Sequence, residues 1–218
     1  GVALKKGKDP KKDQSYFLHA LTGDQLRRSR FPIGRFTKEE VREIARREEL
    51  PVSEKPGSQD ICFVGGSDYR RFVEERHPAA SEEGPIVDTD GEVLGRHSGI
   101  TDYTIGQRKG LGIAAENPLY VVALESEANR VVVGERDELL TERITVGEVN
   151  WINGPPADRR RVGVKTRYRQ EEQPATVLPL AEDRAEVTFH GAIRRPAPGQ
   201  SAVFYDGDVV LGGGVIER

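Results

Sequence analysis

The chain has 218 residues, 36% of them hydrophobic, and carries a formal net charge of −3. This length and composition fit one or two compact folded domains. No apolar run approaches the roughly 18 to 20 residues that a membrane-spanning helix needs, and the N-terminus lacks the apolar core of a signal peptide. We therefore predict a cytoplasmic protein that does not associate with a membrane.

The chain contains one cysteine and no methionine. A lone cysteine allows no disulfide within the chain, which fits a reducing compartment, and it limits any metal site built from thiolates. Because translation starts with methionine, a chain that begins at Gly1 is predicted to be a processed, tagged or excised fragment of a longer protein.

The first third of the chain carries the signals of short helices. Thr37 and Glu40 form a capping-box pattern, apolar residues then follow at helical spacing, and Pro51 ends this helix. A second short helix is predicted over 68–76, before Pro78. An earlier helix is predicted to carry Tyr16, Phe17, Ala20 and Leu21.

From Gly84 onward the apolar residues recur with a period of two, which is typical of β-strands. Strands are predicted at 86–87, 93–94, 120–124, 131–133, 146–151, 162–168, 187–189 and 202–205. Short strands at this spacing favour a small β-barrel or sandwich. The predicted fold class is α+β, with a small N-terminal helical region followed by an antiparallel β-rich region with a C-terminal β-barrel.

Glycine marks the predicted turns. Asp90-Gly91 supplies a turn between the strands at 86–87 and 93–94, and residues 205–208 are predicted to form another tight hairpin. Three consecutive glycines at 212–214 indicate a β-bulge or a close approach of two backbones rather than a phosphate-binding loop.

Two clusters of basic residues are candidate anion-binding surfaces. They lie over 5–12 and over 159–169, and the second contains no acidic residue. A solvated face is the commoner explanation of such runs. Strand alternation, however, would place Val162, Val164 and Thr166 on one face and Arg161, Lys165, Arg167 and Arg169 on the other. Such a row of cations also favours a phosphate track, and Tyr168 adds a ring on which a base could stack.

Cys62 lies in a short apolar run at 61–64, between a polar loop and two glycines. Composition alone favours a buried small hydrophobe, whereas a reactive thiol needs a lowered pKa or an accessible, electropositive setting. The basic, glycine-rich segment 106–112 matches neither a Walker loop nor a dinucleotide fingerprint, which leaves a structural turn and an RNA contact equally open. The four histidines lack ligand spacing, so no metal site is predicted.

Five segments, in order along the whole chain, jointly resemble the bacterial tRNA-specific 2-thiouridylase (MnmA/TrmU) family. They are 12–18 (KDQSYFL), 58–64 (SQDICFV), 103–113 (YTIGQRKGLGI), 165–170 (KTRYRQ) and 198–205 (PGQSAVFY). Each segment alone would be a weak signal, but five in register are highly specific.

The resemblance implies a sulfurtransferase. Enzymes of this family place sulfur at C2 of the wobble uridine in the tRNAs for Lys, Glu and Gln. Their ATP-pyrophosphatase domain adenylates the uridine oxygen with ATP and Mg, and a cysteine persulfide then delivers the sulfur while AMP leaves. Cys62 matches the cysteine that carries the persulfide, and the sulfur donor would be a relay protein or a cysteine desulfurase.

The resemblance also implies domains and RNA contacts. Residues 1–78 would hold the end of the catalytic domain and a helical region with Cys62, 79–140 a central β-rich domain, and 141–218 the C-terminal β-barrel. The positions that match tRNA-contacting residues of the family are Lys12, Asp13, Gln14, Arg167, Tyr168 and Gln200. They lie in or beside the basic clusters, which reverses the preference for a solvated face.

The ATP loop of the family, its neighbouring acid and the second cysteine that can form a disulfide with the persulfide cysteine have no match in this sequence. We predict that they lie upstream of Gly1 and that this chain alone neither binds ATP productively nor completes the reaction. One alternative is a non-catalytic tRNA-binding module built on the β-barrel. Another is a methyltransferase that uses S-adenosylmethionine, which the lack of a glycine-rich strand-to-helix loop disfavours.

Overall fold

The computed structural model describes residues 1–51, 81–181 and 183–217. The chain divides into two compact units, one made of Gly1–Pro56 with Thr141–Arg218 and the other of Gly57–Leu140. The first unit therefore combines the two ends of the sequence, and the second consists of its middle. No helix in the described ranges is long and apolar enough to cross a membrane.

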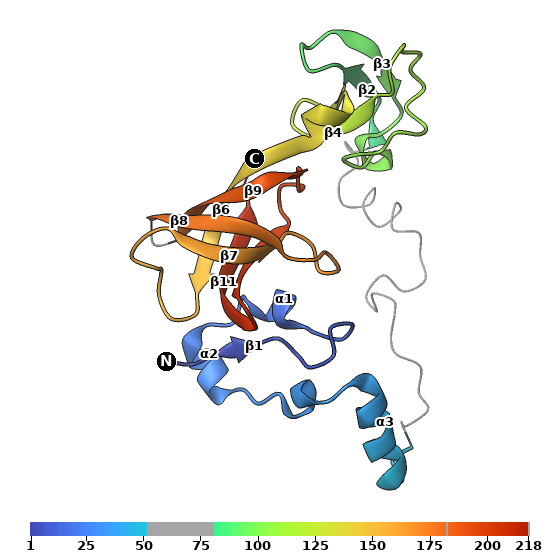
Figure 1. Ribbon diagram of the computed structural model, residues 1–218. Helices are drawn as coiled ribbons and strands as arrows, with labels where there is room; N and C mark the ends of the chain where they lie inside the picture. Colours follow the sequence, from blue (N-terminus) through green and yellow to red (C-terminus); the bar gives the residue numbers. More distant parts are fainter. Residues whose placement is uncertain (52–80, 182, 218) are drawn as a thin grey trace. The chain divides into compact units, whose positions relative to one another are not determined.

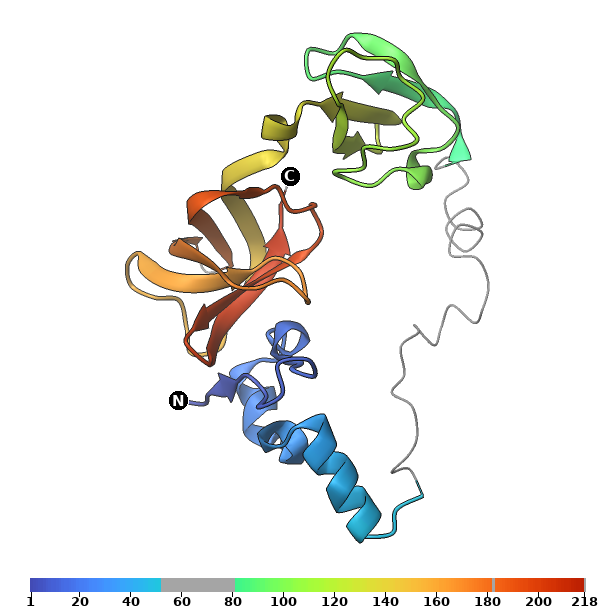
Figure 2. The same cartoon turned by 45° about the vertical axis from the view of Figure 1, so that its right-hand side comes forward.

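A closed barrel of six strands forms most of the first unit (Figures 1 and 2). Its strands are β6 (Leu140–Trp151), β7 (Arg160–Lys165), β8 (Gln173–Ala181), β9 (Arg184–Arg194), β10 (Ser201–Asp206) and β11 (Val209–Ile216). Their order is β11-β10-β7-β8-β9-β6, and β6 pairs back with β11 to close the ring. Closure removes the exposed strand edges that invite aggregation. The predicted α+β class with a C-terminal barrel is confirmed.

Small and β-branched side chains fill the barrel interior. Its fully buried members include Val146, Val164, Ala175, Val177, Ala185, Val187, Ala202 and Phe204. Alternation in the sequence predicts most of these strands, because one face of each strand is buried. It does not predict β8, since Pro174 and Pro179 remove backbone donors and are typical of strand edges and loops. The apolar residues between these prolines nevertheless hold β8 within the barrel.

The three glycines of β11 allow two strands to approach it closely. A Cβ atom on Gly212 would overlap the carbonyl oxygen of Asn150 on β6, and one on Gly213 would lie 2.7 Å from both the carbonyl oxygen of Ala202 and the ring of His19. The β6–β11 register also shifts between Gly213 and Val215. The predicted bulge and the predicted close backbone approach are both confirmed.

The N-terminal segment contains four short helices, and the first two supply residues to a core shared with the barrel. These are α1 (Ser15–Leu18), α2 (Gly23–Arg28), η1 (Pro32–Arg35) and α3 (Lys38–Arg47). The capping box of Thr37 and Glu40 is present at the start of α3, as predicted. Helix α1 is shorter than predicted and excludes Ala20 and Leu21, because a second capping box at Thr22 starts α2 immediately afterwards. The predicted helix at 68–76 and the strand around Cys62 lie outside the described residues.

Strand β1 (Leu4–Lys5) attaches this segment to the barrel. It pairs with Val209 and Val210, the first two residues of β11, while β6 pairs with β11 from Gly212 onward. The two ends of the sequence are thus joined by backbone hydrogen bonds. Leu4 is buried with Val210 in a small hydrophobic core that is separate from the barrel interior.

The second unit contains a four-stranded sheet in the order β3-β2-β5-β4. Its strands are β2 (Gly84–Val87), β3 (Val93–His97), β4 (Tyr120–Glu125) and β5 (Arg130–Gly134), with the short helices η4 (Ile100–Asp102) and η5 (Arg136–Leu139). The β2–β5 pair is parallel, and the other pairs are antiparallel. The predicted Asp90-Gly91 turn joins β2 to β3, where Gly91 has a φ of 89°.

Candidate nucleic-acid interface

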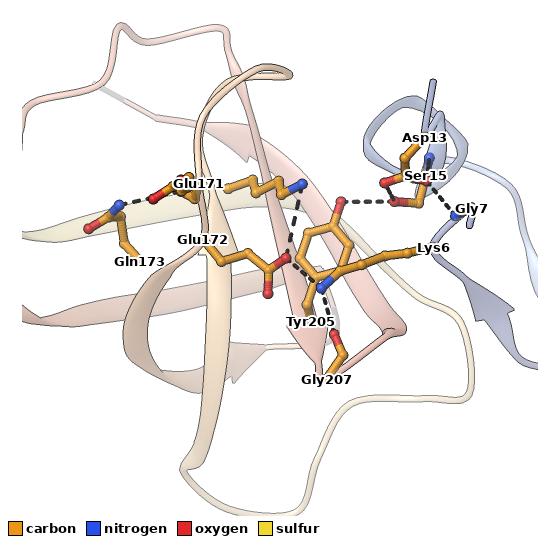
Figure 3. Close-up of polar contacts among 10 residues, drawn as sticks. Lys6, Gly7, Asp13, Ser15, Glu171, Glu172, Gln173, Tyr205 and Gly207 are labelled. Carbon is orange, nitrogen blue, oxygen red and sulfur yellow. Dashed lines mark hydrogen bonds and ion pairs between the residues drawn. The ribbon is translucent and has the colours of Figure 1, made fainter. Parts of the chain in front are cut away.

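Two lysines and one glutamate join the N-terminal segment to the barrel around the buried Tyr205 (Figure 3). Lys6 Nζ lies 2.5 Å from Glu172 Oε1 and donates to the Gly207 carbonyl at 2.7 Å. Lys165 Nζ lies 4.0 Å from the same glutamate oxygen. Both ammonium groups also lie over the ring of Tyr205, at 4.8 and 5.4 Å from its centroid. We call these four residues, Lys6, Lys165, Glu172 and Tyr205, the lysine cluster.

The lysine cluster continues through hydrogen bonds to Asp13 (Figure 3). The Tyr205 hydroxyl lies 3.3 Å from Ser15 Oγ, which donates to Asp13 Oδ2 at 2.6 Å. Asp13 Oδ1 accepts from the backbone nitrogens of Gly7 at 2.9 Å and Ser15 at 3.1 Å. Burial raises the pKa of Tyr205, so its phenol stays neutral. Asp13 is only 8% exposed, and both of its oxygens are occupied within the chain.

Gln14 connects two sequence motifs that are 154 residues apart. Its Nε2 donates to the Tyr168 hydroxyl at 2.7 Å. Lys12 and Gln14 are both exposed on either side of the buried Asp13. The 12–14 loop and the turn that holds Arg167 and Tyr168, which the family resemblance assigned separately to tRNA contact, therefore form one continuous surface.

Phe17 adds an exposed aromatic ring to this surface. Its centroid lies 4.8 Å from that of Tyr168 with an interplanar angle of 38°, and 5.3 Å from that of Tyr16 in an edge-to-face contact. Tyr16 is buried, but Phe17 is 55% exposed. The sequence analysis did not identify Phe17 as a site residue. The sequence does carry a signal for it. Tyr16 and Phe17 are consecutive aromatic residues in a helix of one turn, which can bury only one of the two rings.

Arg167 and Arg169 lie in the turn after β7 and not within the strand. The strand ends at Lys165, and the backbone nitrogen of Gln170 donates to the Arg167 carbonyl at 3.2 Å. Val162, Val164 and Thr166 are buried and Arg161 is exposed, as alternation predicted. The prediction that the strand extends to Tyr168 was wrong, because the chain turns after Lys165.

Gln200 is exposed in the turn before β10. Its carbonyl accepts from the backbone nitrogen of Ile216 at 2.8 Å, and the carbonyl of the next residue, Ser201, accepts from the Tyr16 hydroxyl at 3.0 Å. Gln200 therefore belongs to the same unit as the 12–14 loop and the Arg167–Tyr168 turn. Cys62 lies outside the described residues.

The glycine-rich segment 106–112 belongs to the second unit and has the contacts of a structural turn. The Gln107 side chain accepts from the Thr104 nitrogen at 3.0 Å and donates to the Lys109 carbonyl at 3.0 Å, while Leu111 is buried. Gly106, Gly110 and Gly112 all have positive φ. The segment precedes the strand β4 and no helix, so it lacks the helix N-terminus of a Walker loop or a dinucleotide fingerprint.

The described histidines contact neighbouring polar groups of the chain. His19 Nδ1 lies 2.7 Å from the Tyr16 carbonyl, and burial lowers the pKa of His19. His97 Nε2 lies 3.1 Å from the Asn129 carbonyl, and His190 Nε2 lies 2.9 Å from Thr176 Oγ1. Within the described ranges, no group of three or more potential metal ligands occurs. His77 lies outside them.

Three family models match the chain in order. They are the tRNA methyl transferase HUP domain over residues 1–66, the tRNA methyl transferase PRC-barrel domain over 70–135, and the aminomethyltransferase beta-barrel domain over 141–216. The third of these begins one residue after the first residue of β6 and ends at the last residue of β11.

Curated proteins similar over almost the whole chain are named tRNA-specific 2-thiouridylase MnmA. The one from Geotalea uraniireducens is 50% identical over 215 residues, which cover 99% of this chain and 57% of that protein. The one from Paramagnetospirillum magneticum is 52% identical over 217 residues, which cover 99% of this chain and 58% of that protein. The one from Rhodospirillum centenum is 50% identical over an alignment of 226 residues, which covers 100% of this chain and 58% of that protein. The chain thus spans less than two thirds of the length of these relatives.

Proposed function

Because the chain belongs to the tRNA-specific 2-thiouridylase family, we propose that the complete protein places sulfur at C2 of the wobble uridine of tRNA. Its substrates would be the tRNAs for Lys, Glu and Gln, and it would act in the cytoplasm. In this proposal the chain supplies the sulfur-carrying cysteine and a tRNA-binding surface. The hydrogen bond between Gln14 and Tyr168 carries the structural part of the proposal, because it joins the two proposed tRNA-binding motifs into one surface.

The residues of the proposed surface have different roles in this proposal. Lys12, Arg167 and Gln200 are exposed and would contact phosphates or sugars, which position an RNA without reading its sequence. Phe17 and Tyr168 would stack on an unpaired base, since aromatic side chains bind the faces of splayed bases. Asp13 is buried and saturated with hydrogen bonds, so we assign it the role of positioning Lys12 and Gln14 rather than touching RNA.

The proposed sulfur carrier is Cys62. The terminal sulfur of a persulfide on Cys62 would form a bond to C2 of the uridine as the activated oxygen leaves. The bond between the two sulfurs would then break when a second thiol attacks the Cys62 sulfur, which releases the thiolated base and leaves a disulfide. The donor of the persulfide would be a relay protein or a cysteine desulfurase.

ATP-dependent activation of the uridine is assigned to a part of the complete protein outside the described residues. Within those residues, the basic, glycine-rich segment 106–112 uses the Gln107 side chain for hydrogen bonds within the segment's own turn and does not precede a helix. ATP and Mg therefore enter the proposal as requirements of the complete protein.

The proposal is tested with the complete protein, unmodified tRNA, ATP and a persulfide donor. Formation of 2-thiouridine is measured by mass spectrometry of nucleosides, and tRNA binding is measured in parallel. We expect the wild-type protein to thiolate its tRNA and Cys62→Ser to lose thiolation while it binds tRNA with unchanged affinity.

The alternatives give different outcomes in the same assay. Thiolation that survives in Cys62→Ser would remove Cys62 from the mechanism. Tight binding of tRNA by a wild-type protein that never forms 2-thiouridine would favour a non-catalytic binding module. Transfer of a methyl group from S-adenosylmethionine, measured with a labelled cofactor, would favour a methyltransferase.

A further inference from the structure

The segment that follows α1 is attached to the barrel by one side chain of β6. Asn150 Nδ2 donates to the His19 carbonyl at 2.6 Å and to the Leu21 carbonyl at 2.9 Å. His19 directly follows α1, and Leu21 directly precedes Thr22, the N-cap of α2. Both amide hydrogens of Asn150 therefore hold the link between the two helices.

Helix α1 needs support from outside itself. It has only four residues, and so short a helix is unstable alone because its first turn fixes several backbone angles for very few hydrogen bonds. The last carbonyls of a helix also lack partners within it. Here the Leu18 carbonyl accepts from the Leu21 nitrogen at 3.1 Å, within the segment. Asn150 adds the attachment from the barrel.

The neighbouring strand β11 leaves room for this attachment. Gly213 is opposite Asn150 in the β6–β11 pairing. A Cβ atom on Gly213 would lie 2.7 Å from the ring of His19, so the end of α1 lies directly against the backbone of the barrel. The position of α1 is thus set by contacts with two strands of the barrel.

Helix α1 carries the exposed ring of the proposed tRNA-binding surface. Phe17 is 55% exposed, and its centroid lies 4.8 Å from that of Tyr168. Gln14, the N-cap of α1, donates to the Tyr168 hydroxyl. Because Tyr16 is buried beside Phe17, the orientation of α1 decides which ring faces solvent.

We propose that Asn150 is a positioning residue of the tRNA-binding surface. It holds α1 so that Phe17 and Tyr168 present a stacking site that is formed before RNA binds. A preformed site binds more tightly, because fewer side chains must be ordered on binding. This inference rests on the proposed function and deepens it by naming a residue that acts through Phe17 without touching RNA.

The test measures tRNA binding by the complete protein, using fluorescence anisotropy at several salt concentrations. Asn150→Ala removes both hydrogen bonds to the end of α1. It should weaken binding about fivefold, the loss expected when one ring must be immobilised on binding. The slope of log affinity against log salt should keep its wild-type value, because no phosphate contact is lost.

A double-mutant cycle with Phe17 distinguishes positioning from a merely structural role. If Asn150 acts through Phe17, Asn150→Ala/Phe17→Ala should bind no more weakly than Phe17→Ala alone. A general loss of stability would instead multiply the two losses. Asn150→Ser retains one donor and should lose less affinity than Asn150→Ala. The same cycle is run with Asn150→Ser if the alanine variant does not fold.

Asn153→Ala provides the matched control. Asn153 also makes two hydrogen bonds to the N-terminal segment, accepting from the Val2 nitrogen at 3.2 Å and donating to the Val2 carbonyl at 2.8 Å. These bonds lie at Val2, outside α1 and outside the proposed surface. Asn153→Ala should therefore keep the wild-type affinity and the wild-type salt slope.

The outcomes separate this inference from the proposed function. Wild-type affinity in Asn150→Ala would overturn it, as would losses that multiply in the cycle or an equal loss in Asn153→Ala. A wild-type protein that binds tRNA with the expected dependence on Asn150 but never forms 2-thiouridine would contradict the proposed function alone. A wild-type protein that binds no tRNA would overturn both.

Discussion

Lys165 and Arg167 are two residues apart in one basic run, but the structure places them in two regions with different electrostatics. Lys165 is 18% exposed and belongs to the lysine cluster, where Glu172 lies between it and Lys6. Arg167 is exposed in the turn after β7, beside the residues of the proposed tRNA-binding surface. The first region resembles an internal ion-pair network, and the second is part of an exposed turn.

This contrast shows that a run of basic residues has no single role. A cation that has a carboxylate and a ring beside it contributes to folding, because removal of its partner leaves a charge that is partly shielded from water. A cation that has neither remains available to a ligand. We therefore expect mutations in the lysine cluster to change stability and mutations at Arg167 and the adjacent exposed rings to change RNA binding.

The largest effect is expected at Asp13, the residue of the 12–14 loop that is linked to the lysine cluster through Ser15. Asp13→Ala would leave the partly buried donor of Gly7 and the buried donors of Ser15 without this acceptor, and should lower the free energy of unfolding by about 2–3 kcal/mol. Chemical denaturation followed by the fluorescence of Trp151, the single tryptophan of the chain, measures this loss. Asp24→Ala, which removes an exposed carboxylate beside Arg27, is the control and should have no measurable effect. Unchanged stability with weakened RNA binding would make Asp13 an RNA contact instead.

Glu172→Gln should produce the next largest change in stability. It removes the negative charge shared by Lys6 and Lys165, whose side chains are only 22% and 18% exposed, and should lower the free energy of unfolding by about 1–2 kcal/mol. Glu217→Gln is the matched control, because it removes the partner of the exposed Arg184 and should cost nothing measurable. Equal losses in the two variants would show that the lysine cluster is no different from a surface ion pair.

Phe17→Ala should weaken tRNA binding with little change in stability. Stacking of one base on an aromatic ring contributes about 1–3 kcal/mol, so a loss of roughly tenfold in affinity is expected, measured by filter binding or fluorescence anisotropy. Phe17 is 55% exposed and therefore contributes little to the core. Phe17→Trp preserves a stacking ring and should restore affinity. Wild-type affinity in Phe17→Ala would exclude the ring from the interface.

The smallest effect is expected from the titration of His19, which packs in the same N-terminal segment as Lys6. Burial lowers the pKa of His19, so the unfolded chain binds a proton more readily than the folded chain does. His19 therefore does not reduce the free energy of unfolding above the ordinary histidine pKa of about 6.5. As the pH falls below this value, the free energy of unfolding decreases by less than about 1.4 kcal/mol per pH unit.

Denaturation curves at pH 7.5 and 5.5 measure this effect. His19→Gln should show a smaller loss of stability on acidification than the wild type, while His190→Gln, a change at an exposed position, should lose as much as the wild type. An identical pH dependence in His19→Gln and the wild type would contradict the prediction.

The sequence predicted those elements whose signals are local. The capping box at Thr37 and Glu40 marks the start of α3 because its hydrogen bonds join residues three positions apart. The Asp90-Gly91 turn and the glycines at 212–214 were identified because only glycine tolerates those backbone positions. Strand β8 was missed because its pairing with β7 and β9 and the burial of Ala175 and Val177 override its two prolines. The end of β7 was misplaced because alternation alone does not show where a strand turns.

For the candidate site, the sequence by itself determined which residues match the family motifs and which strand face is buried. Only the tertiary structure decided that Asp13 is buried while Phe17 is exposed, and that Lys165 lies beside Glu172 while Arg167 is exposed in a turn. The physical reason is that burial and charge pairing depend on neighbours distant in sequence, such as Glu172 beside Lys6 or Tyr168 beside Gln14. Barrel closure brings such neighbours together.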